Sequence, residues 1–579
     1  MKFSLLAHAC ADIEQISSRN DITRLLAKLL VQASPTEGAI IANVLCGQLR
    51  APYRGTRFAL AQQQLTKVLA RVLDISEQSV AHTVLRKGDL GLAIPENYSP
   101  KQDSEYSIEQ IYNTLCAIEK LSGSGSQEEK IATVTELLTH VDYISARLII
   151  RIIMGQLRLG VSDMTFIDAL SWVVAGDKSL KSVIEHGYNV CADLGYITYL
   201  LLHEGIEKVT HMNPEVGIPI RPAAAERLPT AEAIFKKLGP CVAQLKLDGF
   251  RVQVHIENKN NIKFFSRNLL DMSDMFPELT RELHDYGISH AILEGEAIGY
   301  DQATKSFLPF QETVKRKRKH DIAGMAEEFP LKLFLFDALV INNRSMLSQS
   351  HEERRTALLK LITHRENSAI QVIGEVKISS AQELEDAFLA AVSSGVEGLV
   401  VKKPQASYQP GSRNFNWIKL KRHEAGTLED TLDVVIIGYY AGRGKRAHFG
   451  IGAVLCAVYN SEKDCFDTIA KIGTGLSDSE WHALKKSCDE YTVAHQLPVV
   501  NCPKGLEPDI WVRPKLVCAV RADEITRSPI HSAGYALRFP RFMEMRIDKN
   551  PTDGTTVNEI VKLFKDQRFV HAWAKKRAS

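Results

Sequence analysis

Lys246 is the residue around which a chemical site can be built from the sequence. It ends an apolar run and precedes an Asp-Gly turn, and residues 250–257 then alternate apolar and polar side chains as in a half-buried strand. An exposed lysine is protonated near pH 7 and is a poor nucleophile. Burial or a neighbouring cation such as Arg251 favours the neutral amine, which can attack an electrophile. Taken alone, the pattern is more typical of a hairpin with solvated charges.

Five further clusters of polar or aromatic residues follow within residues 240–423, each beside a strand-like run. Glu294 and Glu296 are two residues apart, so a strand places both carboxylates on one face. Glu397 precedes a glycine and an apolar run. The other members are Arg267, Phe336, Arg413, Trp417, Lys419 and Lys421. Singly, each has an ordinary structural explanation. Together they offer cations for phosphates, carboxylates for magnesium and an aromatic face for a base.

The elements that must position these residues change along the chain. Residues 1–205 contain apolar stripes at helical spacing, separated by Gly/Ser-rich breaks, which predicts a helical domain. Residues 206–235 are rich in proline and predict a linker. Strands dominate from there to about residue 423, and short strands with turn-rich connections follow to the end, as in a small barrel.

Composition limits the class of protein. The chain has 579 residues, is 45% apolar and 24% charged, and carries a net charge of only +2, so nucleic-acid binding would depend on local basic patches. Its ten cysteines form no C-x-x-C pair, which argues against a zinc ribbon or a disulfide framework. Leu6, Ile13 and Ile16 keep helical spacing, which favours a helix over a signal peptide. We therefore expect a cytoplasmic protein that does not cross a membrane.

Four segments offer contacts to phosphate. Residues 47–55 and 155–162 each place Arg and Gly where a predicted helix ends, and backbone amides with an arginine there could hold a phosphate. Ordinary helix termination is the alternative. Residues 315–320 form a basic run and residues 442–446 a glycine-loosened basic loop, both suited to sequence-independent contacts with DNA. For the basic run, a solvated helix face or a targeting address is the alternative.

In their order, these motifs resemble those of the ATP-dependent DNA ligases of the archaeal and eukaryotic type, a family of covalent nucleotidyltransferases. The resemblance spans nearly the whole chain and includes residues 537–549, which are similar to the last motif of the family. It implies an all-α DNA-binding domain over 1–205, an α+β adenylation domain over 206–423 that includes the linker, and a β-barrel OB-fold domain over 424–579. It also favours Lys246 as a nucleophile over a solvated lysine.

The resemblance implies a three-step reaction. The Lys246 amine attacks the α-phosphate of ATP, the adenylate passes to the 5′-phosphate at a nick in duplex DNA, and the 3′-hydroxyl then displaces AMP. The expected ATP-binding residues are Gln244, Arg251, Arg267, Glu296, Phe336, Arg413, Lys419, Lys421, Arg546, Asp548 and Lys549. Mg²⁺ is expected as a cofactor, with Glu296 and Glu397 as its ligands. The expected DNA-binding residues are Arg158, Lys317, Arg443, Lys445, Arg538 and Arg541.

The chain departs from the family at Gln244, where glutamate is usual and contacts the amino group of adenine. A glutamine amide can accept that bond through its oxygen or turn to donate, so the choice of base stays open. The linker at residues 219–225 also departs from the usual form, without an evident function.

Other reactions fit parts of this pattern. An RNA-capping guanylyltransferase and an RNA ligase share the lysine chemistry, but the helical N-terminal region disfavours both. An NAD-dependent DNA ligase is disfavoured, because it is expected to bring a four-cysteine zinc site and the sequence shows no such motif. A catalytically dead DNA clamp is disfavoured because every expected catalytic position is filled. We expect a monomer, and the sequence identifies no clamp-type accessory protein, no replication or repair pathway and no source organism.

Overall fold

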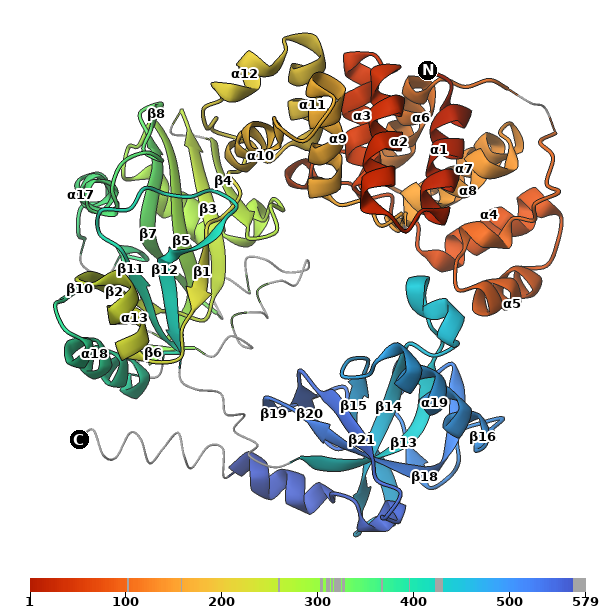
Figure 1. Cartoon of the computed structure of the whole chain (residues 1–579). Coiled ribbons are helices and arrows are strands. Elements are labelled where there is room, and N and C mark those ends of the chain that lie inside the picture. The colour runs from red at the N-terminus through yellow and green to blue at the C-terminus, as the bar shows by residue number, and fades with distance from the viewer. Residues whose placement is uncertain are drawn as a thin grey trace. The chain divides into compact units, whose positions relative to one another are not determined.

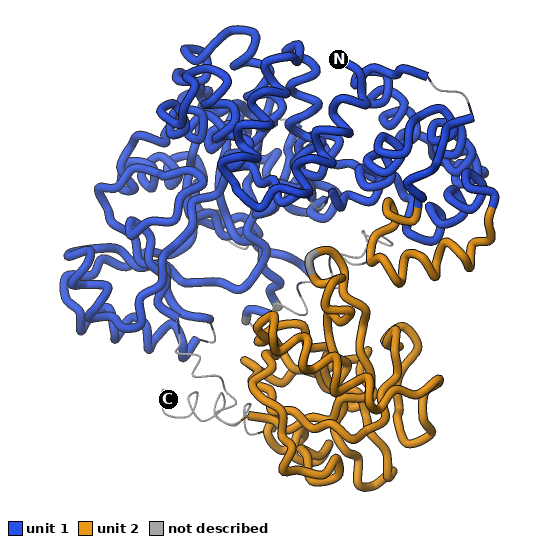
Figure 2. The backbone as a smooth tube through the Cα atoms, turned by 45° about the vertical axis from the view of Figure 1, so that its right-hand side comes forward, with its two compact units in different colours: residues 1–74, 94–422 blue, residues 75–93, 423–579 orange. Residues whose placement is uncertain are grey.

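The computed structural model describes residues 1–101, 104–157, 159–258, 261–301, 306–308, 313, 316, 324, 329–365, 368–394, 396–421 and 431–565. The chain divides into two compact units (Figure 2). Unit 1 comprises Met1–Asp74 and Ile94–Arg422, and unit 2 comprises Ile75–Ala93 and His423–Ser579. No helix among the described residues is both long and apolar enough to cross a membrane.

The N-terminal part of unit 1 is helical, as the apolar stripes predict (Figure 1). Its helices are α1 (Phe3–Gln15), α2 (Arg19–Val31), α3 (Pro35–Leu45), α4 (Gln62–Leu73), α6 (Ile108–Lys120), α7 (Ser126–Thr139), α8 (Tyr143–Met154), α9 (Asp163–Ala175), α10 (Lys181–Val190), α11 (Leu194–His203) and α12 (Ile206–Thr210). The Ser18 side chain accepts from the Asp21 amide and begins α2, and Ile22, Leu26 and Leu30 are buried on its inner face. Helix α12 lies in the predicted linker, so irregular chain begins later than expected.

Two sheets follow in unit 1. One has five strands in the order β1 (Ala224–Arg227), β12 (Arg413–Lys421), β11 (Gly398–Lys402), β2 (Cys241–Lys246) and β10 (Glu375–Ile378). The other orders β4 (Asn261–Ser266), β3 (Phe250–Glu257), β5 (His290–Asp301), β7 (Leu331–Ile341) and β8 (Arg344–Ser345), with β6 (Ser306–Phe307) and β9 (Ile370–Val372) paired beside them. The predicted helices near 352–361 and 381–392 are α17 (His351–Leu361) and α18 (Ala381–Ser393).

The five-stranded sheet has one apolar and one polar face. Helices α13 (Ala231–Leu238) and α18 pack on the face that carries Ala243 and Leu399 (Figure 1). Because side chains alternate along a strand, Gln244 and Lys246 point from the opposite face. The helices therefore leave that opposite face of β2 free to form a site.

The chain crosses from one sheet to the other directly after Lys246. Strand β2 ends at that residue and β3 of the second sheet begins at Phe250. Gly249 makes the crossing possible, because a Cβ at this position would lie 2.4 Å from the carbonyl oxygen of Ala297. The Asp-Gly turn of the sequence is thus a junction between sheets, not the hairpin that the local pattern favours.

Proline-rich chain between α12 and β1 lies on β3. The Gly217 amide donates to His255 Nδ1 at 2.9 Å, and the Ile220 amide donates to Gln253 Oε1 at 2.8 Å. Both acceptor residues are buried. Burial lowers the pKa of His255 to about 3, so its ring is neutral and one nitrogen is free to accept. The polar residues of the alternating pattern in β3 therefore bind the linker, as irregular chain laid over a domain surface requires.

Unit 2 contains a second sheet-rich region. Its main sheet orders β16 (Thr492–Val493), β18 (Ile510–Arg521), β13 (Leu432–Tyr440), β14 (Ala453–Asn460), β15 (Cys465–Ile472) and β17 (Val500–Asn501), and β21 (Arg541–Met545) pairs with β18. Strands β19 (Glu524–Arg527) and β20 (Tyr535–Arg538) form a hairpin, and α19 (Asp478–Asp489) and α5 (Glu77–Lys87) also belong to this unit. The strands expected near 434–440, 453–459 and 516–522 are confirmed as β13, β14 and part of β18.

Candidate active site

Three strand ends place Lys246 beside Glu397 and Lys421. Gly398, the first residue of β11, pairs with Lys246 at the end of β2 and with Lys421 at the end of β12. Glu397 directly precedes Gly398, and its carboxylate forms ion pairs with both lysines. Burial disfavours the charged carboxylate, but the ammonium groups of Lys246 and Lys421 outweigh it and lower the pKa of Glu397.

Gly398 is required at this junction. Its φ is +149°, and an added Cβ would lie 2.2 Å from the carbonyl oxygen of Leu420. The Glu-Gly pair in the sequence therefore has two separate roles. The glycine lets β11 approach β12, and the glutamate places its charge between the two lysines.

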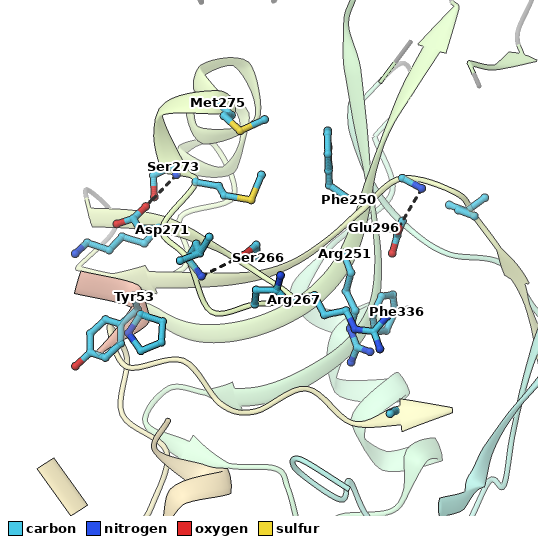
Figure 3. Close-up of a pocket in the computed structure, with 18 of the residues that line it drawn as sticks. Tyr53, Phe250, Arg251, Ser266, Arg267, Asp271, Ser273, Met275, Glu296 and Phe336 are labelled. Carbon is cyan, nitrogen blue, oxygen red and sulfur yellow. Dashed lines mark hydrogen bonds between the residues drawn. The ribbon is translucent and has the colours of Figure 1, made fainter. Parts of the chain in front are cut away.

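A cavity of about 1610 Å³ includes Lys246 in its lining, and Figure 3 shows Arg251, Glu296 and Phe336 at this cavity. Nine of the predicted residues line it: Gln244, Arg251, Arg267, Glu296, Phe336, Arg413, Lys419, Lys421 and Lys246 itself. They come from both sheets of unit 1, and residues 52–57 of the helical region line the same cavity. Among these nine residues, the structure thus brings together side chains separated by as many as 177 positions, from Gln244 to Lys421.

Glu296 faces the junction from the second sheet. The Gly249 amide donates to its Oε1 at 3.1 Å (Figure 3). Burial raises the pKa of Glu296 to about 7, and the charges of Lys246 and Arg251 oppose this rise only in part. A cation bound near Glu296 would favour its ionised form.

Arg251 is bound to protein groups in this ligand-free structure. Its Nη1 donates to the Ala223 carbonyl at 2.7 Å and its Nη2 to the buried Glu294 at 3.0 Å. Its guanidinium carbon lies 5.5 Å from the Phe336 ring centroid and 5.7 Å from that of Trp417. Arg251 therefore holds the aromatic wall in place, and a contact with phosphate would require it to leave Glu294.

The aromatic wall also encloses Lys402, to which the sequence analysis assigned no role. Its Nζ lies 4.2 Å from the Trp417 centroid and 5.0 Å from that of Phe336, and it donates to the Phe336 carbonyl at 3.3 Å. Burial lowers the pKa of Lys402 to about 8. Lys402 ends the run that begins with Glu397 and Gly398, and this position is the signal in the sequence that could have indicated a role. The run does not show that the rings of Phe336 and Trp417 lie beside Lys402.

Gln244 has partners that the sequence does not indicate. Its Nε2 donates to Glu375 Oε2 at 2.7 Å, and the same oxygen lies 2.8 Å from His351 Nε2. Glu375 is on β10, next to β2, and His351 begins α17. Neither residue stands in a motif, and they are 131 and 107 positions from Gln244.

The carboxylates that could bind a metal are few. No three His, Cys, Asp or Glu side chains gather into a metal-binding group within the part of the chain that the structure describes. Magnesium commonly binds through one or two carboxylates together with substrate phosphates. Glu296 fits that pattern, because its raised pKa marks a carboxyl group that a cation would help to ionise, whereas Glu397 is already paired with Lys246 and Lys421.

The predicted residues of the tail lie in unit 2 and gather around Asp433. Arg546 Nη1 donates to Asp433 at 3.2 Å and Lys549 Nζ donates to it at 2.7 Å. Arg546 also forms hydrogen bonds of 2.9 and 2.7 Å with Asp548, and they lower the pKa of Asp548 to about 2. No motif in the sequence indicates a role for Asp433.

The predicted DNA contacts are only partly visible. Arg443, Arg538 and Arg541 are exposed, and Arg538 pairs with Glu524 at 3.1 Å. Arg158, Lys317 and the side chain of Lys445 lie outside the described residues. In the basic run, Arg316 points inward, where it is buried and donates to Glu278 at 2.8 Å. The run is therefore not a uniform basic surface.

The two Arg-Gly phrases lie side by side but use their amides for another purpose. A Cβ on Gly155 would lie 3.8 Å from the Gly47 carbonyl oxygen. The Gly47 amide donates to Val44 and the Gly155 amide to Ile152, which closes the C-terminal turns of α3 and α8. Arg50 pairs with Glu119. Helix termination, the alternative to phosphate binding, therefore accounts for the Gly47 and Gly155 amides.

Comparison with known proteins covers the whole architecture. Family models described as "DNA ligase N terminus", "ATP dependent DNA ligase domain" and "ATP dependent DNA ligase C terminal region" match residues 2–171, 222–421 and 447–549. The chain is 40% identical to a "Probable DNA ligase" of Dictyoglomus turgidum and 33% identical to a "DNA ligase" of Saccharolobus solfataricus. Each alignment covers 98% of both chains.

A solved structure shares the fold. The structure titled "Pmar-Lig_PreS3" superposes with a TM-score of 0.55 at 16% sequence identity, covering 93% of this chain and 99% of the other. Similarity at this identity concerns the arrangement of the backbone alone.

Proposed function

The chain belongs to the ATP-dependent DNA ligases, and from this we propose that Lys246 is the nucleophile with which it seals nicks in duplex DNA. The observation that carries the proposal is the position of the Lys246 amine, at a sheet junction that opens into a cavity and beside a carboxylate shared with Lys421. Similarity to proteins named DNA ligase over 98% of the chain favours this function over RNA ligation, RNA capping or an inactive clamp.

The reaction proceeds by three displacements. The Lys246 Nζ forms a bond to the α-phosphorus of ATP as the bond to the β-phosphate oxygen breaks, and pyrophosphate leaves. The adenylate then moves from Nζ to the 5′-phosphate at the nick. The 3′-hydroxyl attacks that phosphate, and AMP departs. Attack requires the neutral amine, and the nearby Glu397 carboxylate is the group positioned to take the lysine proton.

Cations in the cavity oppose the charge on the phosphates. Arg413, Lys419 and Lys421 extend along β12 toward Lys246 and would contact the α-phosphate, and Arg267 would contact phosphate or ribose. Phe336 would stack on adenine, with Trp417 behind it at 6.1 Å between ring centroids. Arg546, Asp548 and Lys549 would reach the departing pyrophosphate from unit 2.

We also propose Mg²⁺ as the cofactor of this reaction. Glu296 and Glu397 would hold the ion together with oxygens of the triphosphate, and the ion would neutralise charge on the phosphoryl group during transfer. Glu296 would also bind the ribose.

Membership of this family also supports a role for each part of the chain. Residues 1–205 would bind DNA, 206–423 form the adenylation domain, and 424–579 adopt the OB fold. Arg158, Lys317, Arg443, Lys445, Arg538 and Arg541 would contact the DNA backbone. The ten cysteines are free thiols, in keeping with a reducing cytoplasm. We expect the enzyme to act as a monomer.

Labelling with α-³²P-ATP and magnesium tests the proposal. Wild type should retain an acid-labile label after denaturation and should lose it when nicked DNA is added. Lys246→Ala should take no label, whereas Lys236→Ala, which removes an exposed lysine on α13, should label normally. Labelling of Lys246→Ala to the wild-type level would refute the assignment, and labelling of wild type by GTP alone would favour a capping enzyme.

A further inference from the structure

We propose that Glu375, supported by His351, is a specificity-determining positioning residue that fixes the Gln244 amide with its oxygen toward the cavity. The site then accepts a purine with an amino group at position 6 and rejects one with an oxygen there. This inference rests on the proposed function, because it concerns the nucleotide that is transferred to Lys246.

Strand register places Glu375 beside Gln244. Gln244 pairs with Glu375 on β10 at one side and with Val400 on β11 at the other. Gln244 and Val400 line the cavity, and Gln244 is two residues before Lys246 on the same face of β2. The exposed fraction of Gln244 is 2%, so its amide must satisfy its hydrogen bonds within the protein or with a ligand.

The charge of Glu375 determines which end of the amide it binds. Burial opposes ionisation, but hydrogen bonds from His351 and Gln244 and the nearby Arg355 lower the pKa of Glu375. An ionised carboxylate accepts hydrogen bonds and donates none. The Gln244 amide must therefore present its NH₂ group to Glu375 and keep its carbonyl oxygen at the other end.

His351 keeps this arrangement from reversing. Burial and the charge of Lys402 lower the pKa of His351, so its ring is neutral. Since Glu375 can only accept, the single ring proton lies on Nε2 and points to Glu375. Protonated Glu375 could turn and donate to Gln244, but the bond from His351 favours the ionised form.

The consequence is a fixed acceptor in the cavity. Within the described residues, the Gln244 side chain makes no second hydrogen bond, and the cavity is the space into which its oxygen can accept. A 6-amino group donates to that oxygen, whereas a 6-oxo group would place two acceptors against each other. Sites built around such a polar contact reject the mismatched analogue strongly, since a buried group is left unpaired.

The same geometry explains why glutamine replaces glutamate at position 244. A carboxylate there would lie opposite ionised Glu375 in a buried setting, and two like charges so close cannot both be stable. Glutamine supplies the same acceptor oxygen and uses its NH₂ group to satisfy Glu375.

Self-adenylation with ATP and with inosine triphosphate, which carries a 6-oxo group, tests the inference. The quantity compared is the ratio of kcat/KM for ATP to kcat/KM for inosine triphosphate. In Glu375→Gln, position 375 can donate as well as accept, so Gln244 is free to turn and the ratio should fall at least about tenfold. Asp386→Asn, which neutralises an exposed acid on α18, should keep the wild-type ratio.

A swapped pair separates this role from a loss of folding. Gln244→Glu should slow adenylation with both nucleotides, because it places two carboxylates together. Gln244→Glu combined with Glu375→Gln restores one acid and one amide, so the ratio should return to within about threefold of wild type. Sealing of a pre-adenylated nick does not require attack of Lys246 on a triphosphate, so measurable sealing by a variant shows that it is folded.

Two results would overturn the inference while leaving the ligase function intact. One is a wild-type ratio in Glu375→Gln, and the other is a swapped pair that seals pre-adenylated DNA but does not regain the ratio. Wild type that takes no label with any nucleotide would refute the proposed function and this inference with it.

Discussion

In each unit, the candidate site residues include two cations bridged by a carboxylate, and the two clusters differ in how the backbone holds them. In unit 1, Glu397 lies between Lys246 and Lys421. In unit 2, Asp433 lies between Arg546 and Lys549. The first cluster is held by three neighbouring strands whose ends are in register. In the second, only Asp433 is on a strand, and both cations follow the end of β21.

This difference separates a fixed site from a releasable one. Strand pairing holds the backbone from which Lys246 and Lys421 extend. Arg546 and Lys549 lie beyond the end of β21, and their side chains contact the buried Asp433 from there. The cluster in unit 1 is thus suited to hold the reacting lysine, and the cluster in unit 2 to give its cations to a substrate.

Replacing the bridging acid of the fixed cluster should have the largest effect. Glu397→Gln leaves Lys246 and Lys421 without a shared counter-charge and removes the group positioned to take the lysine proton. Self-adenylation should fall by about 10²- to 10³-fold, as for the loss of one electrostatic group in other active sites. Single-turnover labelling with α-³²P-ATP measures this rate.

A matched substitution in the other cluster provides the control. Asp433→Asn also neutralises one bridging acid, and it should change the same rate by less than about fivefold. Similar losses in both variants would contradict the distinction between a fixed and a releasable cluster.

Asp548 tests whether the tail serves one step of the reaction. Asp548→Ala removes both hydrogen bonds that orient the Arg546 guanidinium. If the tail assists departure of pyrophosphate, self-adenylation should fall by about tenfold or more, while sealing of a pre-adenylated nick should change by less than about threefold. Equal losses in the two assays would assign Asp548 to the stability of unit 2.

The contrast also explains what the sequence could predict. Lys246, Glu397 and Lys421 stand in short runs with strand periodicity, and the resemblance of the motif order to the DNA ligases predicts one shared site for them. The same holds for Arg267, Arg413 and Lys419, which all line the cavity. Such residues are found because their local pattern already contains the strand that orients them.

The missed residues lack that local signal. Asp433 and Glu375 act through partners more than a hundred positions away, and His351 acts through Glu375, 24 positions away. Sheet order determines these contacts, and no periodicity within one strand encodes sheet order. At the Arg-Gly phrases, by contrast, a local signal was present, because helix termination, the alternative to phosphate binding, accounts for the Gly47 and Gly155 amides.

Among the ion pairs of the described residues, Glu296 takes no part, although it lies near Lys246, and in this it differs from Glu397. Its pKa of about 7 lies above its ordinary value, so the folded state binds a proton more tightly than the unfolded state. Stability is therefore favoured at low pH and lost as pH rises from about 4.5 to about 7. Glu296→Gln removes this loss and should raise the Tm of the ligand-free enzyme by about 2 °C at pH 8, with no change at pH 5.

Thermal unfolding across this pH range measures the effect. Glu136→Gln, which removes an exposed acid on α7, should follow wild type throughout. A Glu296→Gln Tm that is lower than wild type at pH 8 would show that the ionised carboxylate stabilises the fold, as Glu397 does between its lysines.

Asp433→Asn should give the smallest effect, and its direction distinguishes two roles for the releasable cluster. If Asp433 competes with the triphosphate for Arg546 and Lys549, neutralising it frees both cations and removes a negative charge from the phosphates, so KM for ATP should fall by about two- to fivefold. If Asp433 instead holds the cations in their working position, KM should rise. Initial rates of self-adenylation at several ATP concentrations decide between them, and the effect should shrink at high salt because exposed charges are screened. We expect KM to fall. Lys549 has only Asp433 among the ion pairs of the described residues, so Asp433→Asn frees Lys549 for the triphosphate, while Asp548 still pairs with Arg546.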